Sequence, residues 1–247
     1  MEVHHHPHIE KKSFKEYLLE GLMIFLAVSM GFIAENIREK IVENHREKEF
    51  AITLMEDLKN DTLDLNSSIP FWTNYKNYID TIRTEIDKKE NNRDLILLYF
   101  NVAKLNTNFT FRYHDRTIMQ LKAGNFRLIR SKTVSDSLVE YDAVYNTLLK
   151  NIEGNYDEYK LRQMTLCEQL FSSRYFLLTK NHEQLDSAFK TDPEAFTIRK
   201  GKEDILFEYY NFLYDHKSLC NARLFFLKRQ QKWAISLIKL IQKEYHL

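Results

Sequence analysis

The sequence predicts an all-α protein with a single N-terminal transmembrane helix that continues into a helical-bundle domain ending in a long antiparallel hairpin. Among 247 residues there are only 5 Gly and 3 Pro, which argues against a turn-rich β-protein. Charged residues make up 29% of the chain, and long stretches contain no helix breaker. Aromatic residues make up 13%, more than a disordered tail carries, so we expect a packed core. The net charge of +1 implies no field for nucleic acid.

Residues 1–12 are predicted to form a disordered arm. This arm carries His4, His5, His6 and His8 before a lysine pair. Clustered neutral imidazoles can bind zinc, copper or nickel, so these four residues are weak candidate metal ligands. The alternative is a solvated polar arm that holds no metal.

Residues 13–35 are predicted to form the transmembrane helix. The apolar stretch Tyr17–Ala34 reads YLLEGLMIFLAVSMGFIA and spans about 27 Å as a helix, close to the hydrocarbon thickness of a bilayer. Glu20 opposes insertion by at most roughly 3 kcal/mol, and by less near the end of a span. Nine Leu, Ile, Phe or Val residues favour insertion by about 0.3 to 0.6 kcal/mol each. The sum favours insertion.

A cleaved signal peptide is the main alternative to a retained anchor. Lys11, Lys12 and Lys15 would form its basic region, and Ser29-Met30-Gly31 resembles a cleavage site. Helical periodicity continues through that site, which favours a retained anchor. Basic residues flank the span on both sides, so the positive-inside rule is nearly balanced. A short cytoplasmic tail would leave the large domain outside.

One face of the span is a candidate interface between copies of the chain. Small residues on this face allow helices to approach closely, and its members are Glu20, Ile24, Ala27, Gly31 and Ala34. In an oligomer, Glu20 would form a ring of carboxylates, which suggests an ion pathway as an alternative function. A single glutamate near the membrane boundary can also reach the interface as an anchor.

Residues 36–69 are predicted to form a charged stalk helix, and residues 70–247 the helical bundle. Pro70 is expected to end or redirect the stalk, with a second helix over Phe71–Lys89. Within the stalk, Asp57, Asp61 and Asp64 share one face beside Glu56. Such carboxylates can hold a hard cation, but no histidine lies near them in the sequence. The alternative is either a solvated acidic face or a set of partners for arginine and lysine residues elsewhere in the chain.

A third helix is expected over Arg93–Leu105, followed by an irregular segment, Asn106–Arg130. This segment is expected to contain a short helix from His114 to Ala123 that Gly124 caps. Its basic residues can meet lipid head groups or pair with acidic helices, and they are Arg112, Arg116, Lys122, Arg127, Arg130 and Lys132.

The C-terminal hairpin is predicted from two apolar stripes. The first runs from Val134 to Leu177, with a bend expected at Gly154. The second repeats every seven residues in a helix from Glu203 to about Lys243, which indicates coiled-coil-like packing. Its apolar members are Leu206, Leu213, Cys220, Leu227, Ala234 and Ile241. The companion positions His216, Arg223 and Gln230 are polar, which argues against a simple two-stranded zipper.

Cys167 and Cys220 lie symmetrically about the loop near Asp192-Pro193. Antiparallel packing around that loop would place the two thiols at nearly the same height. They are therefore expected to form a disulfide in an oxidising compartment, or to be two small core residues.

The sequence contains no catalytic signature. His114-Asp115-Arg116 lacks the downstream elements of a kinase loop, and no Gly-x-Ser-x-Gly, His-Glu-x-x-His or Cys-x-x-Cys occurs. We therefore expect no enzyme, no catalytic residue and no cofactor. A metal-dependent enzyme that uses Asp57 and Asp61 is the alternative.

The first 62 residues resemble a group of uncharacterised bacterial membrane proteins typical of the Bacteroidota. The resemblance rests on the His-bearing tail, FLAVSMGFIAE in the span, the charged helix after it and LMEDLK at residues 54–59. A weaker likeness covers LKAGNFRLI at residues 121–129. The resemblance implies membrane residence and leaves the role unassigned. We expect a single-pass protein of the bacterial inner membrane, and the short N-terminal tail predicts that the soluble domain lies in the periplasm. The expected partners are the lipid bilayer and either further copies of the chain or other subunits of a membrane complex. The expected role is a scaffold, sensor or accessory subunit.

Overall fold

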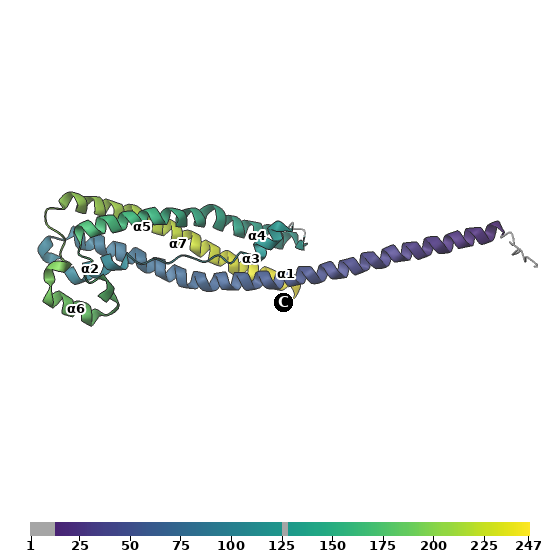
Figure 1. Ribbon diagram of the computed structural model, residues 1–247, viewed down its shortest axis with the longest axis horizontal. Coiled ribbons are helices and arrows are strands. Elements are labelled where there is room, and N and C mark those ends of the chain that lie inside the picture. Colours follow the sequence, from purple (N-terminus) through teal and green to yellow (C-terminus); the bar gives the residue numbers. More distant parts are fainter. Residues whose placement is uncertain (1–12, 125–127) are drawn as a thin grey trace, which may run out of the picture. The chain divides into compact units, whose positions relative to one another are not determined.

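The computed structural model describes residues 13–124 and 128–247, which are about 85% helical and contain no strand. The prediction of an all-α protein is therefore confirmed. The helices in chain order are α1 (Phe14–Asp87), α2 (Leu95–Lys104), α3 (Arg116–Ala123), α4 (Lys132–Val144), α5 (Lys150–Leu170), α6 (His182–Thr191) and α7 (Glu203–Tyr245) (Figure 1). Shorter turns are η1 (Glu90–Asn92), η3 (Tyr145–Leu149), η4 (Phe176–Lys180) and η5 (Pro193–Phe196). The predicted histidine arm lies outside the described residues.

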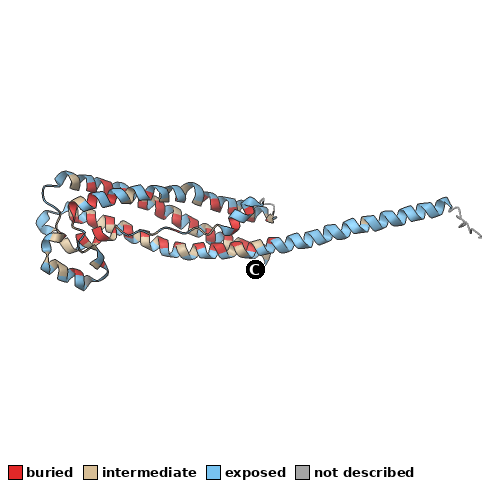
Figure 2. Cartoon of the chain, viewed as in Figure 1, coloured by how far each residue is buried: buried red, intermediate tan, exposed pale blue. Residues whose placement is uncertain are grey.

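The chain divides into two units, of which the first ends at Phe50 and the second comprises Ala51–Leu247. In the first unit α1 begins at Phe14, as predicted from the apolar stretch. Every described residue from 13 to 46 is exposed except Ser29, which is half-buried (Figure 2). The second unit begins at Ala51 rather than at residue 70, because Ala51, Leu54, Leu58 and Leu65 already belong to its core.

Helix α1 does not end or turn at Pro70, so the predicted boundary between two helices is wrong. A proline inside a helix removes the hydrogen bond to the carbonyl four residues earlier, here that of Asn66. Asn66 and Pro70 are both exposed, so water can bond to that carbonyl. Leu65 and Trp72 are buried on either side, and their packing holds the helix together across the proline.

The second unit is a bundle of long helices. The part of α1 from Ala51 onward, the run α4–η3–α5, and α7 lie lengthwise side by side (Figure 1). Helix α7 runs antiparallel to α1, because Gln231 bonds to Asn66 at 2.6 Å near one end and Arg83 bonds to Tyr210 at 3.1 Å near the other. It is also antiparallel to α4 and α5, as predicted for the C-terminal hairpin.

Details of the hairpin differ from the prediction. The first stripe ends at Leu170, and Leu177 is 90% exposed in η4, because α6 and its flanking turns occupy the connection. Helix α5 passes through Gly154, and the irregular turn lies at η3, a single π-type turn. A separate small core of Tyr99, Leu185 and Phe196 packs α2 against α6 and η5.

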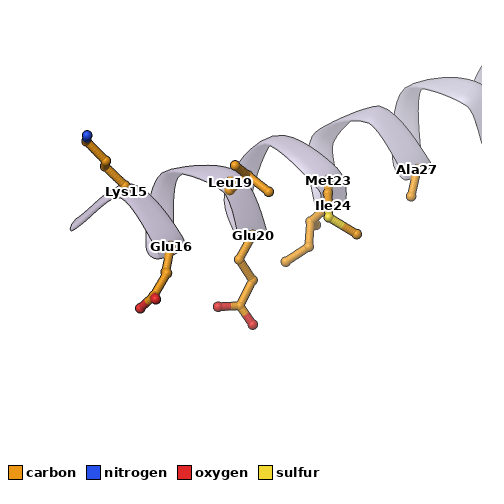
Figure 3. Close-up of a pocket in the computed structure, with 7 residues that line it drawn as sticks. All are labelled: Lys15, Glu16, Leu19, Glu20, Met23, Ile24 and Ala27. Atoms are coloured by element: carbon orange, nitrogen blue, oxygen red, sulfur yellow. The ribbon is translucent and has the colours of Figure 1, made fainter. Parts of the chain in front are cut away.

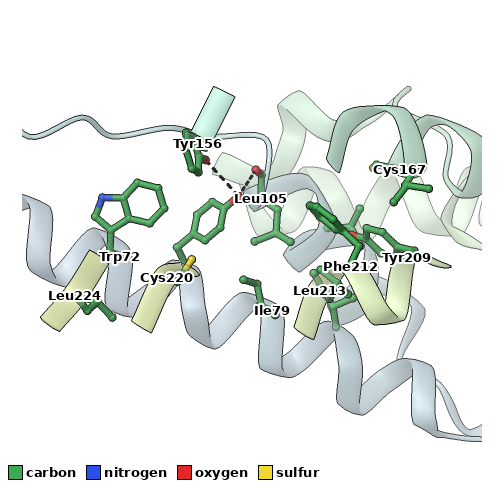
Figure 4. Close-up of a cluster of buried hydrophobic side chains, with 14 of the residues drawn as sticks. Trp72, Ile79, Leu105, Tyr156, Cys167, Tyr209, Phe212, Leu213, Cys220 and Leu224 are labelled. Atoms are coloured by element: carbon green, nitrogen blue, oxygen red, sulfur yellow. Dashed lines mark hydrogen bonds between the residues drawn. The ribbon is translucent and has the colours of Figure 1, made fainter. Parts of the chain in front are cut away.

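The two cysteines do not form a disulfide. Both thiols are free and buried, with Cys167 beside Tyr209 and Cys220 farther along α7 toward Leu224 (Figure 4). Gln163 of α5 bonds to Tyr209 of α7, and Arg223 of α7 contacts the Ile152 carbonyl of α5. The midpoint in sequence between such paired residues lies before Asp192-Pro193, where the prediction placed it. In this register, the two cysteines are offset along the paired helices by roughly 15 residues, or about 22 Å. The alternative of two small core residues, at different heights in the bundle, fits this register.

Candidate functional site

The apolar stretch of α1 has the length and composition of a membrane span, and none of it is buried in the protein. A soluble core helix would be mostly buried, whereas Phe25 and Phe32 in this stretch are 65% and 69% exposed. Helix α1 continues unbroken through Ser29-Met30-Gly31. These observations are compatible with a single-pass anchor, and an N-terminal signal sequence would have the same composition.

The predicted interface residues lie in this stretch. Figure 3 shows Glu20, Ile24 and Ala27 projecting from one side of the helix. Together with Lys15, Glu16, Leu19 and Met23 they form an open, mostly apolar surface of the helix. Apart from its chain neighbours and the backbone of its own helix, no atom of the described chain lies within 4 Å of where a β-carbon at Gly31 would be.

A network of carboxylates lies in the second unit, where the sequence suggested a solvated acidic face. Asp57 and Asp61 are 5% and 1% exposed, so a solvated face is wrong for both, whereas the alternative of pairing with a basic residue is observed for Asp57 and Arg116. Asp61 accepts hydrogen bonds from the backbone N–H of His114 at 2.7 Å and from the Tyr141 hydroxyl at 2.6 Å. The His114 ring nitrogen Nδ1 lies 3.0 Å from the same carboxylate and 4.0 Å from that of Asp64. The fold thus brings to the acidic residues a histidine that sequence proximity did not.

Asp57 holds the first turn of α3. Its Oδ2 accepts from the backbone N–H of Thr117 at 2.9 Å and from the Thr117 hydroxyl at 2.6 Å. Arg116 then pairs with Asp57 at 3.4 Å and with Glu56 at 3.7 Å. A carboxylate at a helix N-terminus satisfies backbone donors that have no intrahelical partner. Asp57 therefore positions α3 against α1.

A polar pocket of about 330 Å³ opens beside this network. Its lining consists of Glu56, Asp57, Asn60, Arg112, Tyr113, His114, Asp115 and Arg116. Within residues 13–124 and 128–247, no group of three or more His, Cys, Asp or Glu side chains is arranged to hold a metal ion. Asp57 and Asp61 serve as hydrogen-bond acceptors for the chain, and Asp61 contacts both the backbone N–H and the ring nitrogen Nδ1 of His114.

The basic residues predicted around this segment are partly used in ion pairs with acidic helices. Arg116 pairs with α1, and Lys122 pairs with Asp142 of α4. Arg112 and Lys132 are exposed. Arg127 lies outside the described residues. Ion pairing, one of the two alternatives, is thus observed for Arg116 and Lys122.

A second set of polar side chains lies inside the bundle. They are on α7, on the face next to the apolar seven-residue repeat. Tyr209, His216, Arg223 and Gln230 follow each other at seven-residue intervals, and all are at most 3% exposed. Gln163 donates to the Tyr209 hydroxyl at 3.0 Å, and Gln230 donates to the Tyr141 carbonyl at 3.3 Å. We call these four residues the polar seam. The sequence identified three of them as polar, but not as buried.

Arg223 lies between aromatic rings. Its guanidinium carbon is 4.0 Å from the Trp72 ring centroid and 4.6 Å from that of Tyr156, as in cation–π contacts. One Nη donates weakly to the Ile152 carbonyl at 3.5 Å, while Nε has no partner. Burial lowers the pKa of this guanidinium, and the nearby Glu153 carboxylate opposes that shift.

His216 is the least satisfied member of the polar seam. Neither ring nitrogen has a hydrogen-bond partner, and the rings of Tyr75, Tyr156, Tyr159 and Phe212 surround the imidazole. Burial, followed by the charge of Arg223, lowers the pKa of His216 to about 4. The imidazole is therefore neutral at physiological pH, and it contributes two buried polar atoms that lack partners.

The substitution His216→Leu is expected to stabilise the bundle. An unsatisfied buried polar group costs about 1 to 3 kcal/mol, and leucine fills a similar volume without one. In the wild type, the contribution of His216 to stability falls as pH decreases from about 6.5 to about 4, because only the unfolded chain takes up the proton easily at this residue. Thermal unfolding in detergent at pH 7.5 and pH 5 checks both points: the variant should melt at a higher temperature than the wild type, and the difference should be larger at pH 5.

Leu213→Ala, which removes a buried apolar side chain one turn earlier, is the control and should lower the midpoint of thermal unfolding. A loss of stability in His216→Leu as large as in this control would contradict the expectation.

No protein-family model, curated protein or solved structure shows a significant match to this chain.

Proposed function

We propose that the chain is a non-enzymatic, single-pass membrane protein that acts as a scaffold, sensor or accessory subunit. The observation that carries this proposal is the stretch Tyr17–Ala34, which is long and apolar enough to cross a bilayer and buries nothing within the protein. Without lipid or a partner, its exposed side chains would favour aggregation. An apolar helix with an aromatic-rich helical bundle on the same chain suits a protein that displays a folded domain at a membrane.

The resemblance to membrane proteins of the Bacteroidota supports residence in a bacterial inner membrane. In this proposal the short N-terminal tail stays in the cytoplasm and the second unit lies in the periplasm. The free, buried thiols of Cys167 and Cys220 are compatible with either side, because their separation prevents a disulfide even in an oxidising compartment.

Self-association through the span is part of the same proposal. The face of Glu20, Ile24, Ala27, Gly31 and Ala34 combines small residues with one acidic residue, and Gly31 leaves space for a second helix. In lipid, close approach of helices through small residues is a common means of association. Alternatively, the chain is a subunit of a complex with other membrane proteins.

Native mass in lipid discs tests this proposal, because it separates a lone anchor, a homo-oligomer and a subunit that co-purifies with others. We expect the wild-type chain to give more than one copy per disc. Gly31→Leu places a bulky side chain on the proposed face and should return the mass to one copy. Met30→Leu, on a neighbouring position off this face, is the matched control and should keep the wild-type mass. A single copy in the wild type, without other proteins, would contradict self-association.

An ion pathway is the second candidate function, and the position of Glu20 favours it. In Figure 3 the Glu20 side chain projects on the same side of the helix as Ile24 and Ala27, so an oligomer through this face would gather its carboxylates. Conductance across a planar bilayer that changes in Glu20→Gln would support the pathway. Well-formed oligomers without conductance would exclude it.

A further inference from the structure

The connection between α2 and α3, residues 106–115, has no regular secondary structure, and we call it the strap. Its backbone carbonyls, and that of Leu105 just before it, accept hydrogen bonds from buried aromatic side chains. Trp72 Nε1 donates to the Phe109 carbonyl at 3.1 Å, and the Tyr75 hydroxyl donates to the Leu105 carbonyl at 2.9 Å. The Tyr156 hydroxyl lies 3.4 Å from the Thr107 carbonyl. Phe111 is 1% exposed, so the strap is also part of the core.

Two backbone N–H groups of the strap donate hydrogen bonds to carboxylates from different helices. Glu153 of α5 accepts from the backbone N–H of Phe111 at 3.3 Å. Asp61 of α1 accepts from the backbone N–H of His114 at 2.7 Å, and the same carboxylate accepts from Tyr141 of α4. Asp61 therefore ties the strap, α1 and α4 together at one point.

Asp61 is enclosed by titratable and charged groups from every element that packs around it. They are Asp57 and Asp64 on α1, Tyr113, His114 and Asp115 on the strap, Arg116 on α3, Tyr141 on α4 and Tyr145 on η3. The Glu153 carboxylate interacts electrostatically with Arg223 of α7 and with Tyr145. Asp61 is 1% exposed, so its negative charge is poorly solvated while the strap is in place.

We propose that the strap is a proton-controlled element: uptake of a proton by Asp61 fastens it to α1 and α4, and loss of that proton loosens it. The neutral carboxyl can donate its proton to the Tyr141 oxygen and still accept from the His114 N–H, so the connections persist without a buried charge. The proposal concerns the second unit alone and does not depend on the membrane anchor.

The direction follows from proton linkage. Burial is the largest influence on the carboxyl and, despite the opposing hydrogen bonds from Tyr141 and His114, raises the pKa of Asp61 from 3.8 to about 6. Burial also raises the pKa of Glu153. Asp61 therefore binds its proton more tightly when the strap is fastened than when the strap is released and the carboxyl is solvated. Lower pH consequently favours the fastened state. Over the full range the ratio of the two states changes about 100-fold, of which about tenfold falls between pH 5 and pH 7.5.

Global unfolding is a poor measure of this effect, because His216 acts in the opposite direction over the same pH range. The lowered pKa of His216 destabilises the fold as pH falls, whereas the raised pKa of Asp61 stabilises it. The two contributions offset each other in a melting temperature. A measurement confined to the strap separates them, since His216 lies on α7 and makes no hydrogen bond to the strap.

The test is amide hydrogen exchange of residues 106–115 in the full chain, held in lipid discs at pH 5 and pH 7.5 and corrected for intrinsic exchange rates. We expect the opening equilibrium of the Phe111 and His114 amides to increase about tenfold at pH 7.5. Asp61→Asn imitates the neutral carboxyl and should keep exchange slow at both pH values. Asp136→Asn, at an exposed position on α4, should keep the tenfold dependence. Exchange that does not change, or that slows at pH 7.5, would overturn the proposal, as would a tenfold dependence in Asp61→Asn.

A second readout does not require a variant of Asp61 to fold. The chain has two tryptophans, so Trp233→Phe leaves Trp72, whose indole is bonded to the strap, as the sole tryptophan reporter. Acrylamide quenching of its fluorescence should be stronger at pH 7.5 than at pH 5. Quenching that is equal at the two pH values, or stronger at pH 5, would overturn the proposal.

Discussion

Replacing Phe25 and Leu26 together with arginine is expected to abolish membrane insertion of the chain. Both residues lie near the middle of the apolar stretch, and both are exposed. Each arginine near the centre of a span costs about 2.5 to 3.5 kcal/mol on insertion scales, and each substitution also removes a favourable contribution of about 0.3 to 0.6 kcal/mol. The total of roughly 6 to 8 kcal/mol exceeds the modest net gain of the wild-type stretch. Alkaline extraction of membranes should then release the variant into the supernatant.

The matched control exchanges the same two residues, Phe25→Leu with Leu26→Phe. This variant keeps the apolar content and the length of the span, so it should stay in the membrane pellet. If the double-arginine variant also stayed in the pellet after extraction, another part of the chain would have to hold it there.

Trp72→Ala is expected to lower the free energy of unfolding of the second unit by about 3 to 5 kcal/mol. Trp72 is 1% exposed and packs edge-on against Tyr156, with ring centroids 5.1 Å apart. Its ring also lies 4.0 Å from the guanidinium of Arg223, and its indole N–H holds the strap through the Phe109 carbonyl. The substitution would leave a cavity and a buried arginine that keeps only one aromatic face. Chemical denaturation in detergent, followed by helical circular dichroism, measures the loss.

Trp233→Ala is the control for Trp72→Ala. Trp233 is half-buried on α7, where Arg229 lies over its ring at 4.7 Å. The control should cost clearly less, because part of its ring is solvated in the folded state. Equal losses for the two variants would contradict the central position of Trp72 in the core.

The sequence was sufficient to predict the helices whose apolar spacing is regular. The start of α1 at Phe14, the short helix that ends before Gly124 and the start of α7 at Glu203 all agree with the expected positions. Of the heptad residues in α7, Leu213, Cys220, Leu227, Ala234 and Ile241 are buried, as such a repeat requires. These features depend on local periodicity, which a single chain displays directly.

The errors arose where tertiary contacts outweigh local signals. Pro70 does not end α1, because Leu65 and Trp72 pack on either side of it. The register of α5 against α7 depends on how residues 171–202 fold between them, and an unexpected helix, α6, moved the centre of the hairpin away from Asp192-Pro193. Cys167 and Cys220 were therefore placed at the same height when they are not.

The polar sites were hardest to predict, because their members are distant in the sequence. Asp61 meets His114 and Tyr141, which lie 53 and 80 residues further along the chain. The sequence did contain a signal for the contact between Asp61 and His114. An i, i+4 pair of aspartates on the stalk and an isolated His-Asp-Arg triplet were both charged features without an assigned partner. The burial of His216, Arg223 and Gln230 had a signal too, since each lies seven residues from the next, in the same spacing as the apolar core.

Flotation of the full-length wild-type chain with liposomes in a density gradient, after alkaline washing and without detergent, tests the central claim most directly. If lipid surrounds the stretch Tyr17–Ala34, the intact chain should float with the liposomes, and a chain that begins at residue 36 should remain at the bottom of the gradient. If instead the intact chain stayed at the bottom as a soluble monomer, the anchor and the function proposed from it would both be contradicted.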